Sequence, residues 1–183
     1  MKLYSVTITE WFESYHIDDD PAYLISRFIS NDSLLEEWGG KELKLQFRGK
    51  KRPLAFCFTI SGLLLTQKGK KMLGDVFSDE DTELIPLVFG TKEFFLVHCT
   101  KSVKLDAFEL ESWTIGKPLY HMNLEEIESH NLQERYYFKV ELNNGRLSDL
   151  LFTEKFINLV KEREIQGVEF EELWDSEGEN GER

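Results

Sequence analysis

The stretch that decides the fold runs from Leu150 to Trp174 and reads L-L-F-T-E-K-F-I-N-L-V-K-E-R-E-I-Q-G-V-E-F-E-E-L-W. An apolar strand end leads into Thr153, which predicts a helix N-cap because a threonine hydroxyl accepts a hydrogen bond from an unpaired helix N–H. Apolar residues then recur at helical spacing, at Phe156, Leu159 and Val160. Gly167 predicts a turn, and the alternation that follows is typical of a strand. The stretch therefore predicts a strand–helix–strand unit.

The same pattern occurs earlier in the chain, from Leu63 to Phe89. Here L-L-L-T-Q-K is followed by M-L-G and later by the apolar run L-I-P-L-V-F. Aligning Thr66 with Thr153 also places a lysine two residues later in both stretches. The chain therefore predicts two strand–helix–strand units, at about residues 63–89 and 150–174. Because full-length strand–helix crossovers do not alternate regularly elsewhere, the predicted fold class is α+β, with a mixed, mainly antiparallel sheet.

Glycine-containing turns predict where two other strands begin or end. Gly90-Thr91-Lys92 predicts a hairpin between the preceding apolar strand and a strand at residues 93–100. The apolar and aromatic run Tyr136–Leu142 predicts another strand, which ends at the Asn143–Gly145 turn.

Length and composition limit the kind of protein. With 183 residues, of which 41% are hydrophobic, the chain suits one core-forming domain, which we place at residues 1–175. Residues 176–183 contain no apolar side chain and predict a disordered acidic tail. The apolar runs are shorter than the roughly 20 residues of a membrane span, and the N-terminus lacks the apolar segment of a signal peptide. Cys57 and Cys99 lie in apolar runs, which favours buried thiols and a cytoplasmic location.

The net charge of −12 is unevenly distributed along the chain. Residues 41–71 hold nine Lys or Arg and one acid, a net charge of +8, whereas residues 106–183 hold 19 acids and eight bases, a net charge of −11. An acidic surface attracts basic partners and speeds their encounter, and ordinary solubility charge is the alternative interpretation. The basic stretch Arg48–Pro53 predicts a loop without the interleaved aromatic residues of nucleic-acid-binding modules, so we expect no nucleic-acid partner.

Catalytic patterns are weak. His121 and Glu125 are four residues apart, as are Glu126 and His130, and on a helix each pair would share a face as two metal ligands do. The chain contains no H-E-x-x-H motif, and Asn123 is typical of a helix N-cap, after which glutamates suit a solvated face. We therefore expect no catalytic residue, no cofactor and no metal ligand. A metal-dependent enzyme, or a ligand-sensing or scaffold domain, is the alternative to a binding protein.

One set of residues in the closing segment, L-S-D-L-L-F-T-E-K-F-I-N-L-V-K-E-R-E-I-Q-G-V-E-F-E-E-L-W-D, carries a family resemblance: Phe156, Leu159, Val160, Gly167, Val168, Phe170, Leu173 and Trp174. The segment resembles the closing signature of an immunity-protein family from bacterial polymorphic toxin systems, once a domain of unknown function and catalogued as immunity protein eleven. The middle of the chain is similar in four places: Leu63–Leu73, the strand around Pro86, Phe94–Val97 and Val103–Asp106. Residues 1–50 and 107–140 match this family poorly.

The resemblance implies a protein that protects a cell by binding and blocking a cognate toxin domain, without catalysis and without a membrane partner. The acidic charge is compatible with a basic toxin. We hypothesise that the partner meets an acidic surface formed by Asp18, Asp19, Asp20, Glu125, Glu126 and Glu128. Trp38 and Trp113 are candidate aromatic anchors because tryptophan is enriched at binding hot spots, while core packing is the favoured interpretation of both residues.

Overall fold

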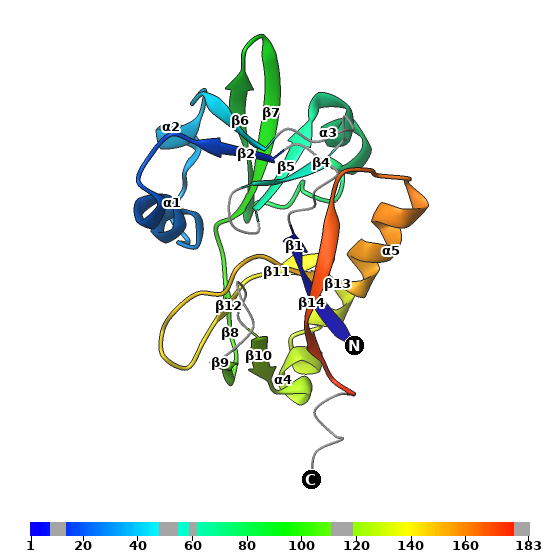
Figure 1. The fold of residues 1–183 in the computed structure, drawn as a ribbon. Helices are drawn as coiled ribbons and strands as arrows, with labels where there is room; N and C mark the ends of the chain where they lie inside the picture. The colour runs from blue at the N-terminus through cyan, green and yellow to red at the C-terminus, as the bar shows by residue number, and fades with distance from the viewer. Residues whose placement is uncertain (8–13, 48–54, 59–61, 111–118, 178–183) are drawn as a thin grey trace.

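The computed structural model describes residues 1–7, 14–47, 55–58, 62–110 and 119–177, and its strands form two main sheets (Figure 1). The six-stranded sheet contains, in spatial order, β3 (Leu43–Phe47), β2 (Ser14–Ile17), β4 (Ala55–Phe58), β5 (Gly62–Thr66), β7 (Lys92–Cys99) and β6 (Thr82–Phe89). The four-stranded sheet contains β11 (Tyr137–Phe138), β13 (Leu151–Thr153), β1 (Lys2–Thr7) and β14 (Glu169–Asp175). Two short pairs join β10 (Leu119–Met122) to β9 (Ala107–Leu110) and β12 (Val140–Glu141) to β8 (Val103–Lys104).

The helices are short, and along the chain they fall in the segments that connect these strands. They are α1 (Pro21–Phe28), α2 (Leu35–Trp38), α3 (Gln67–Leu73), α4 (Leu124–Ser129), α5 (Glu154–Glu162) and the 3-10 helix η1 (Leu132–Glu134). Most strand pairings are antiparallel, and β2–β4 and β8–β12 are parallel. The predicted α+β class is confirmed, although the strands form several sheets rather than one.

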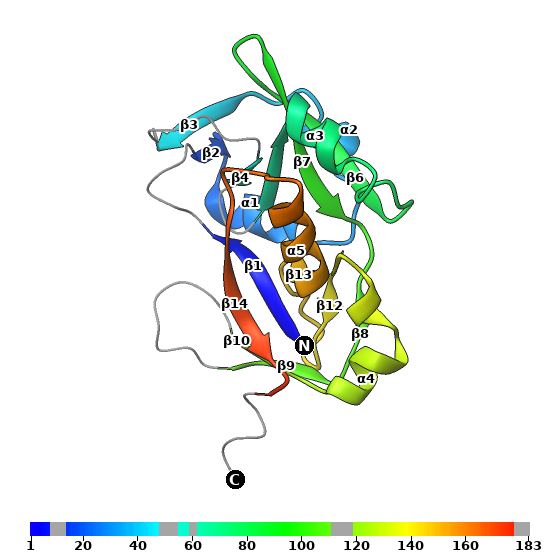
Figure 2. The ribbon, with the colours of Figure 1, turned by 90° about the vertical axis from the view of Figure 1, so that its right-hand side faces the viewer.

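Both predicted strand–helix–strand units are present, and they share one topology. In the first, β5–α3–β6, the two strands run parallel and β7 lies antiparallel between them. In the second, β13–α5–β14, β1 lies between the two parallel strands in the same way. The repeated sequence pattern therefore corresponds to a repeated unit, with one copy in each main sheet. Both helices lie on the same side of the molecule (Figure 2).

A large core joins the two units. Leu73 of α3 and two residues of α5, Phe156 and Val160, are buried in the same cluster as Leu63 and Leu65 of β5. Leu64 points to the opposite face of β5 and is buried in a second core. Successive strand residues point to opposite faces, so a strand with a core on each side is apolar without alternation. This explains the unbroken leucine run at residues 63–65.

The second core lies where the two edges of the six-stranded sheet approach each other. Glu42 forms a parallel bridge with Val88, and the backbone N–H of Val88 donates to the carbonyl of Lys41 at 3.0 Å. Leu24 of α1 and Trp38 of α2 pack into this core. The two N-terminal helices are therefore attached to the sheet by buried apolar side chains.

The turns follow the sequence predictions. Phe89 pairs with Lys92, so a two-residue loop connects β6 and β7, and Gly90 in this loop has φ +61°. Gly145 has φ +78° at the second predicted turn, where its N–H donates to the carbonyl of Leu142 at 2.8 Å. A positive φ is strained for residues with a Cβ, which explains glycine at both positions.

Three other predictions concern the buried thiol, the C-terminal tail and the basic stretch. Cys99 is a free, buried thiol, as predicted. Ser176, the first residue of the predicted tail, donates its backbone N–H to the carbonyl of Met1 at 3.0 Å, and the disordered tail stays a prediction. The basic stretch 48–53 and residues 178–183 lie outside the described residues.

The two predicted helix-capping threonines differ. Thr66 Oγ1 accepts the N–H of Gly69 at 3.0 Å, which is a true N-cap contact. Thr153 occupies the equivalent position before α5, but its hydroxyl instead donates to the carbonyl of Arg135 at 2.7 Å. The predicted position is correct and the predicted contact is wrong, because a neighbouring segment supplies an acceptor in the folded protein.

We expect Thr66→Ala to lower the free energy of unfolding by about 1 kcal/mol, because the helix loses its cap. Urea denaturation followed by circular dichroism measures the change. Thr66→Ser keeps the capping oxygen and is the matched control. Equal losses in the two variants would contradict a capping role for the hydroxyl.

Candidate functional site

The six predicted acidic partner-binding residues do not form one surface. Asp18, Asp19 and Asp20 lie between β2 and α1, next to the six-stranded sheet. Glu125, Glu126 and Glu128 lie on α4, at the opposite end of the molecule (Figures 1 and 2). The six residues therefore form two separate acidic groups, and their contact with a partner stays a prediction.

The three aspartates have local partners. Asp18 forms an ion pair with Lys44, whose ammonium group lowers the pKa of this carboxyl, and Asp19 lies 3.5 Å from Lys41. Asp20 caps α1 by accepting the backbone N–H three residues later at 2.9 Å. Lys41 and Lys44 belong to the basic region 41–71, so part of its positive charge neutralises Asp18 and Asp19.

The three glutamate side chains of α4 have fewer contacts with other residues than the aspartates have. Asn123 Oδ1 caps the helix through the N–H of Glu125 at 2.9 Å, as predicted. Glu126 accepts the backbone N–H of Asp106 at 2.5 Å. Glu125 and Glu128 are exposed. This helix therefore presents negative charge to solvent.

Trp38 is a core residue. Its side chain has no exposed surface, and its indole N–H donates to Glu37 Oε1 at 2.9 Å. The hypothesis that Trp38 is an aromatic anchor is wrong, because a fully buried ring has no surface for a partner, whereas core packing is confirmed. Trp113 lies outside the described residues.

Two short helices, α1 and α2, carry exposed apolar side chains that the sequence analysis did not single out. Among the residues that the structure describes, the large hydrophobic side chains classed as exposed are Tyr23 (37%), Ile25 (37%) and Leu35 (46%). All three lie on α1 or α2. We define the α1–α2 surface as Tyr23, Arg27, Leu35, Glu36 and Glu37.

Glu37 connects the two helices of this surface. It accepts hydrogen bonds from the Tyr23 hydroxyl, from Arg27 Nη2 at 2.8 Å and from the Trp38 indole. These donors, with Tyr23 first, lower the pKa of the Glu37 carboxyl to about 2. Arg27 also pairs with Asp32 at 2.7 Å. The tyrosine and arginine side chains are therefore fixed before any partner binds.

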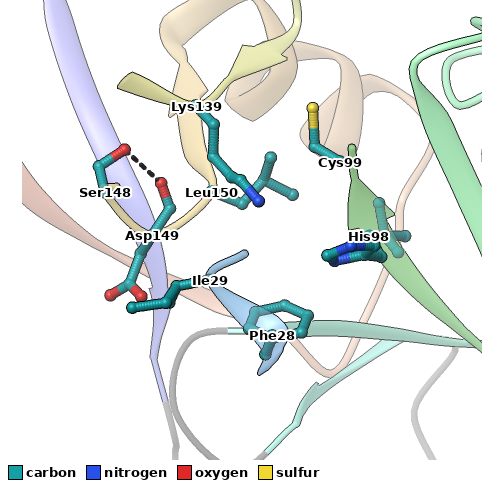
Figure 3. Close-up of a pocket in the computed structure, with 9 residues that line it drawn as sticks. Phe28, Ile29, His98, Cys99, Lys139, Ser148, Asp149 and Leu150 are labelled. Carbon is teal, nitrogen blue, oxygen red and sulfur yellow. Dashed lines mark hydrogen bonds between the residues drawn. The ribbon is translucent and has the colours of Figure 1, made fainter. Parts of the chain in front are cut away.

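A second candidate site is a small cavity between the two main sheets, shown in Figure 3. Its volume is about 10 Å³, which is room for about one water molecule. It is lined by Phe28, Ile29, Val97, His98, Cys99, Lys139, Ser148, Asp149 and Leu150. Lys139 lies at the break between β11 and β12, which interrupts the predicted strand 136–142.

Lys139 is a buried cation. Its side chain is 3% exposed, and Nζ donates to the carbonyl of Ser30 at 2.6 Å. Burial lowers the pKa of Lys139 to about 8, despite the opposing effects of Cys99 and Asp149. Within the described part of the chain, no carboxylate forms an ion pair with this ammonium group. Figure 3 shows the amine directed toward the middle of the residues that line the cavity.

His98 and Cys99 are the other titratable groups on the cavity wall that are almost fully buried. His98 Nε2 lies 3.0 Å from the carbonyl oxygen of Asp32, and Nδ1 has no hydrogen-bond partner among the described residues. Burial lowers the pKa of His98 and raises the pKa of the Cys99 thiol. A thiol with a raised pKa is a poor nucleophile at neutral pH, so Cys99 is typical of a core residue.

Of the two residue pairs considered for a metal site, only Glu126 and His130 lie one helical turn apart. His121 lies on β10 and Glu125 on α4, so the two do not share a helix face. Glu126 lies within α4 and His130 is the residue that ends it. In the described ranges, no group of three His, Cys, Asp or Glu side chains is placed to hold a metal ion.

Parts of both sites had a signal in the sequence. Asp20-Pro21 is a helix-start pattern, an N-cap residue followed by proline, and it marks α1. In the run Y-Y-F-K-V-E-L, strand alternation places Lys139 on the face of Glu141, opposite Phe138 and Val140, so the pattern alone indicates an exposed lysine. Nothing in the local sequence marks the contact between Lys139 and Ser30, which are 109 residues apart.

The chain matches no protein-family model and no curated protein. In the described residues, no helix has both the length and the apolar character needed to cross a membrane.

Proposed function

We propose that the protein is a cytoplasmic immunity protein of a bacterial polymorphic toxin system. It binds a cognate toxin domain and neutralises it by protein–protein interaction, without catalysis. The resemblance of residues 147–175 to the closing segment of such proteins supports this proposal. The observation that carries it is the α1–α2 surface, where Glu37 holds Tyr23 and Arg27 and where Leu35 is exposed on the adjoining helix.

The composition of this surface suits a protein partner. Tyr and Arg are the residue types most enriched, with Trp, at the energetic centres of protein interfaces. Tyr23 and Arg27 are both held by Glu37, so binding loses less side-chain entropy than it would with free rotamers. Leu35 adds exposed apolar area on the adjoining helix. These features support a preorganised binding surface.

The charge around this surface suits a basic partner. Residues 18–37 contain six acids and one base, a net charge of −5. Charge of this sign attracts a basic domain and raises its association rate at low ionic strength. Glu125 and Glu128 of α4 add to the long-range attraction from a separate position on the molecule. The cognate toxin is therefore expected to be basic.

Co-expression with the toxin domain encoded beside its gene tests the proposal. We expect the wild-type chain to restore growth and the purified pair to form a complex. Tyr23→Ala combined with Leu35→Ala is expected to weaken the complex about a hundredfold, because two apolar contacts at an interface centre are lost. Isothermal titration calorimetry measures the affinity, and Asn158→Ala, an exposed change on α5, is the matched control.

The results test the proposed function and the proposed binding surface separately. A toxin that the wild-type chain neither binds nor neutralises contradicts the proposed function. Full affinity in the Tyr23/Leu35 double variant would instead exclude the α1–α2 surface while leaving the function intact. Replacing Glu125, Glu126 and Glu128 with lysine should slow association at low salt, and an unchanged on-rate there would exclude a role for α4 in attraction.

A further inference from the structure

The segment that connects α1 to α2 is held in place by polar contacts with residues far away in the sequence. We call residues 29–34 the α1–α2 linker. Its contacts are the Ser30 carbonyl with Lys139 Nζ (2.6 Å), the Asp32 carbonyl with His98 Nε2 (3.0 Å), Asn31 Nδ2 with Ser102 Oγ (2.8 Å) and the Leu34 N–H with Glu83 Oε2 (2.9 Å). Two of these four partners, Lys139 and His98, are buried titratable groups.

The geometry around His98 depends on its protonation state. The Asp32 carbonyl oxygen can only accept, so the contact requires a proton on Nε2 and leaves Nδ1 as a lone pair in neutral histidine. Nδ1 has no partner among the described residues, and the ring is 1% exposed. A second proton on this ring would create a buried donor without an acceptor, in a cavity that already contains the Lys139 ammonium group.

We propose that the contact of His98 with the Asp32 carbonyl is proton-sensitive: together with the Lys139 contact it holds the α1–α2 linker at neutral pH, and its loss in acid releases the linker. On acidification, His98 Nδ1 takes a proton from solvent, and the linker moves away to let water reach the ring. The linker carries both helices of the α1–α2 surface, so the same event disturbs that surface. The inference concerns the chain alone and holds whether or not its partner is a toxin.

The surroundings of His98 favour release of the linker in acid. The charged or titratable groups that surround His98 and its cavity are Lys139, Arg27, Glu83, Asp32, Cys99 and Asp149. Burial opposes a second proton most strongly, and Lys139 and Arg27 also oppose it, whereas the hydrogen bond with the Asp32 carbonyl favours it. Glu83, which pairs with His98 across β6 and β7, favours the proton but already accepts the N–H of Leu34.

The sign of the pH effect follows from linkage. The pKa of His98 is lower in the folded protein than its ordinary value of 6.5. The released state therefore binds more protons below pH 6.5, and acid shifts the equilibrium toward it. The equilibrium constant for release increases by up to about tenfold for each pH unit below 6.5, until the folded pKa is reached.

Hydrogen exchange of the free protein tests the inference. The amides of Ser30 and Leu34 are hydrogen-bonded in the linker, and their protection factors, corrected for intrinsic exchange, are compared at pH 7.5 and pH 5.0. We expect protection to fall about tenfold or more at pH 5.0 in the wild-type chain. His98→Gln keeps an N–H donor near the position of Nε2 but does not titrate, so its linker should stay protected.

Each result decides the question. Unchanged protection in the wild-type chain, or an equal loss in His98→Gln, overturns the inference. If His98→Gln does not fold, an NMR titration of the His98 ring in the wild-type protein replaces it. A measured ring pKa clearly below 6.5, with linker amide shifts that titrate together with the ring, supports the inference, and a ring pKa at or above 6.5 overturns it.

Discussion

Replacing Phe156 with alanine is expected to lower the free energy of unfolding by about 4 kcal/mol, because removing a buried phenylalanine loses its burial energy and leaves a cavity. The Phe156 ring is fully buried on α5 and stacks on Phe152 of β13 with 4.7 Å between ring centroids. It also contacts Phe77, which follows α3, at 5.8 Å, and Phe170 of β14 at 5.9 Å. One side chain thus joins the two strand–helix–strand units.

Urea denaturation measures this effect. Asn158→Ala, an exposed change two residues along the same helix, is the control and should change the free energy of unfolding by less than about 0.5 kcal/mol. A single transition that shifts to lower urea would indicate that both sheets unfold together. A loss below about 1 kcal/mol for Phe156→Ala would contradict the central place of this ring in the core.

The second large effect is expected from Lys139→Met between pH 8 and pH 10.5. The pKa of Lys139 is lowered from 10.5 to about 8 in the folded protein, because burial disfavours the charged amine. Between these values the unfolded chain binds more protons, so the stability of the wild-type protein rises with pH. The rise amounts to about 3 kcal/mol relative to a variant without the amine.

The measurement is the difference between the unfolding free energies of wild type and Lys139→Met across this pH range. Other groups titrate in both proteins, so their effects cancel in the difference. Lys104→Met is the matched control, because the Lys104 side chain is 77% exposed. The difference in unfolding free energy between wild type and Lys104→Met should not change with pH. Parallel curves for wild type and Lys139→Met would show that the buried amine keeps an ordinary pKa.

The sequence predicted the two strand–helix–strand units because their signals are local. Apolar periodicity and turn glycines depend on residues a few positions apart, and these choose the local structure directly. The pattern was also sufficient to predict the β6–β7 hairpin. It was insufficient for the partner of Thr153, since Arg135 lies 18 residues away and reaches the hydroxyl only through the fold.

The candidate sites were less predictable than the fold. Asp18 and Asp19 are acidic in the sequence, but the folded chain places Lys44 and Lys41 beside them. Trp38 is a residue type common both in cores and at interfaces, and only its neighbours decide between the two. The exposure of Tyr23 and Leu35 likewise depends on which side of each short helix meets the sheet.

The sequence by itself determined the α+β class, the repeated unit, the main turns and the acidic character of the chain. The tertiary structure alone decided which charges are neutralised, which aromatic residues are exposed, and that Lys139 and His98 share one cavity. The physical reason is range. Helices, turns and apolar alternation are set by neighbouring residues, whereas burial and the pKa of a side chain are set by whatever distant segments pack around it.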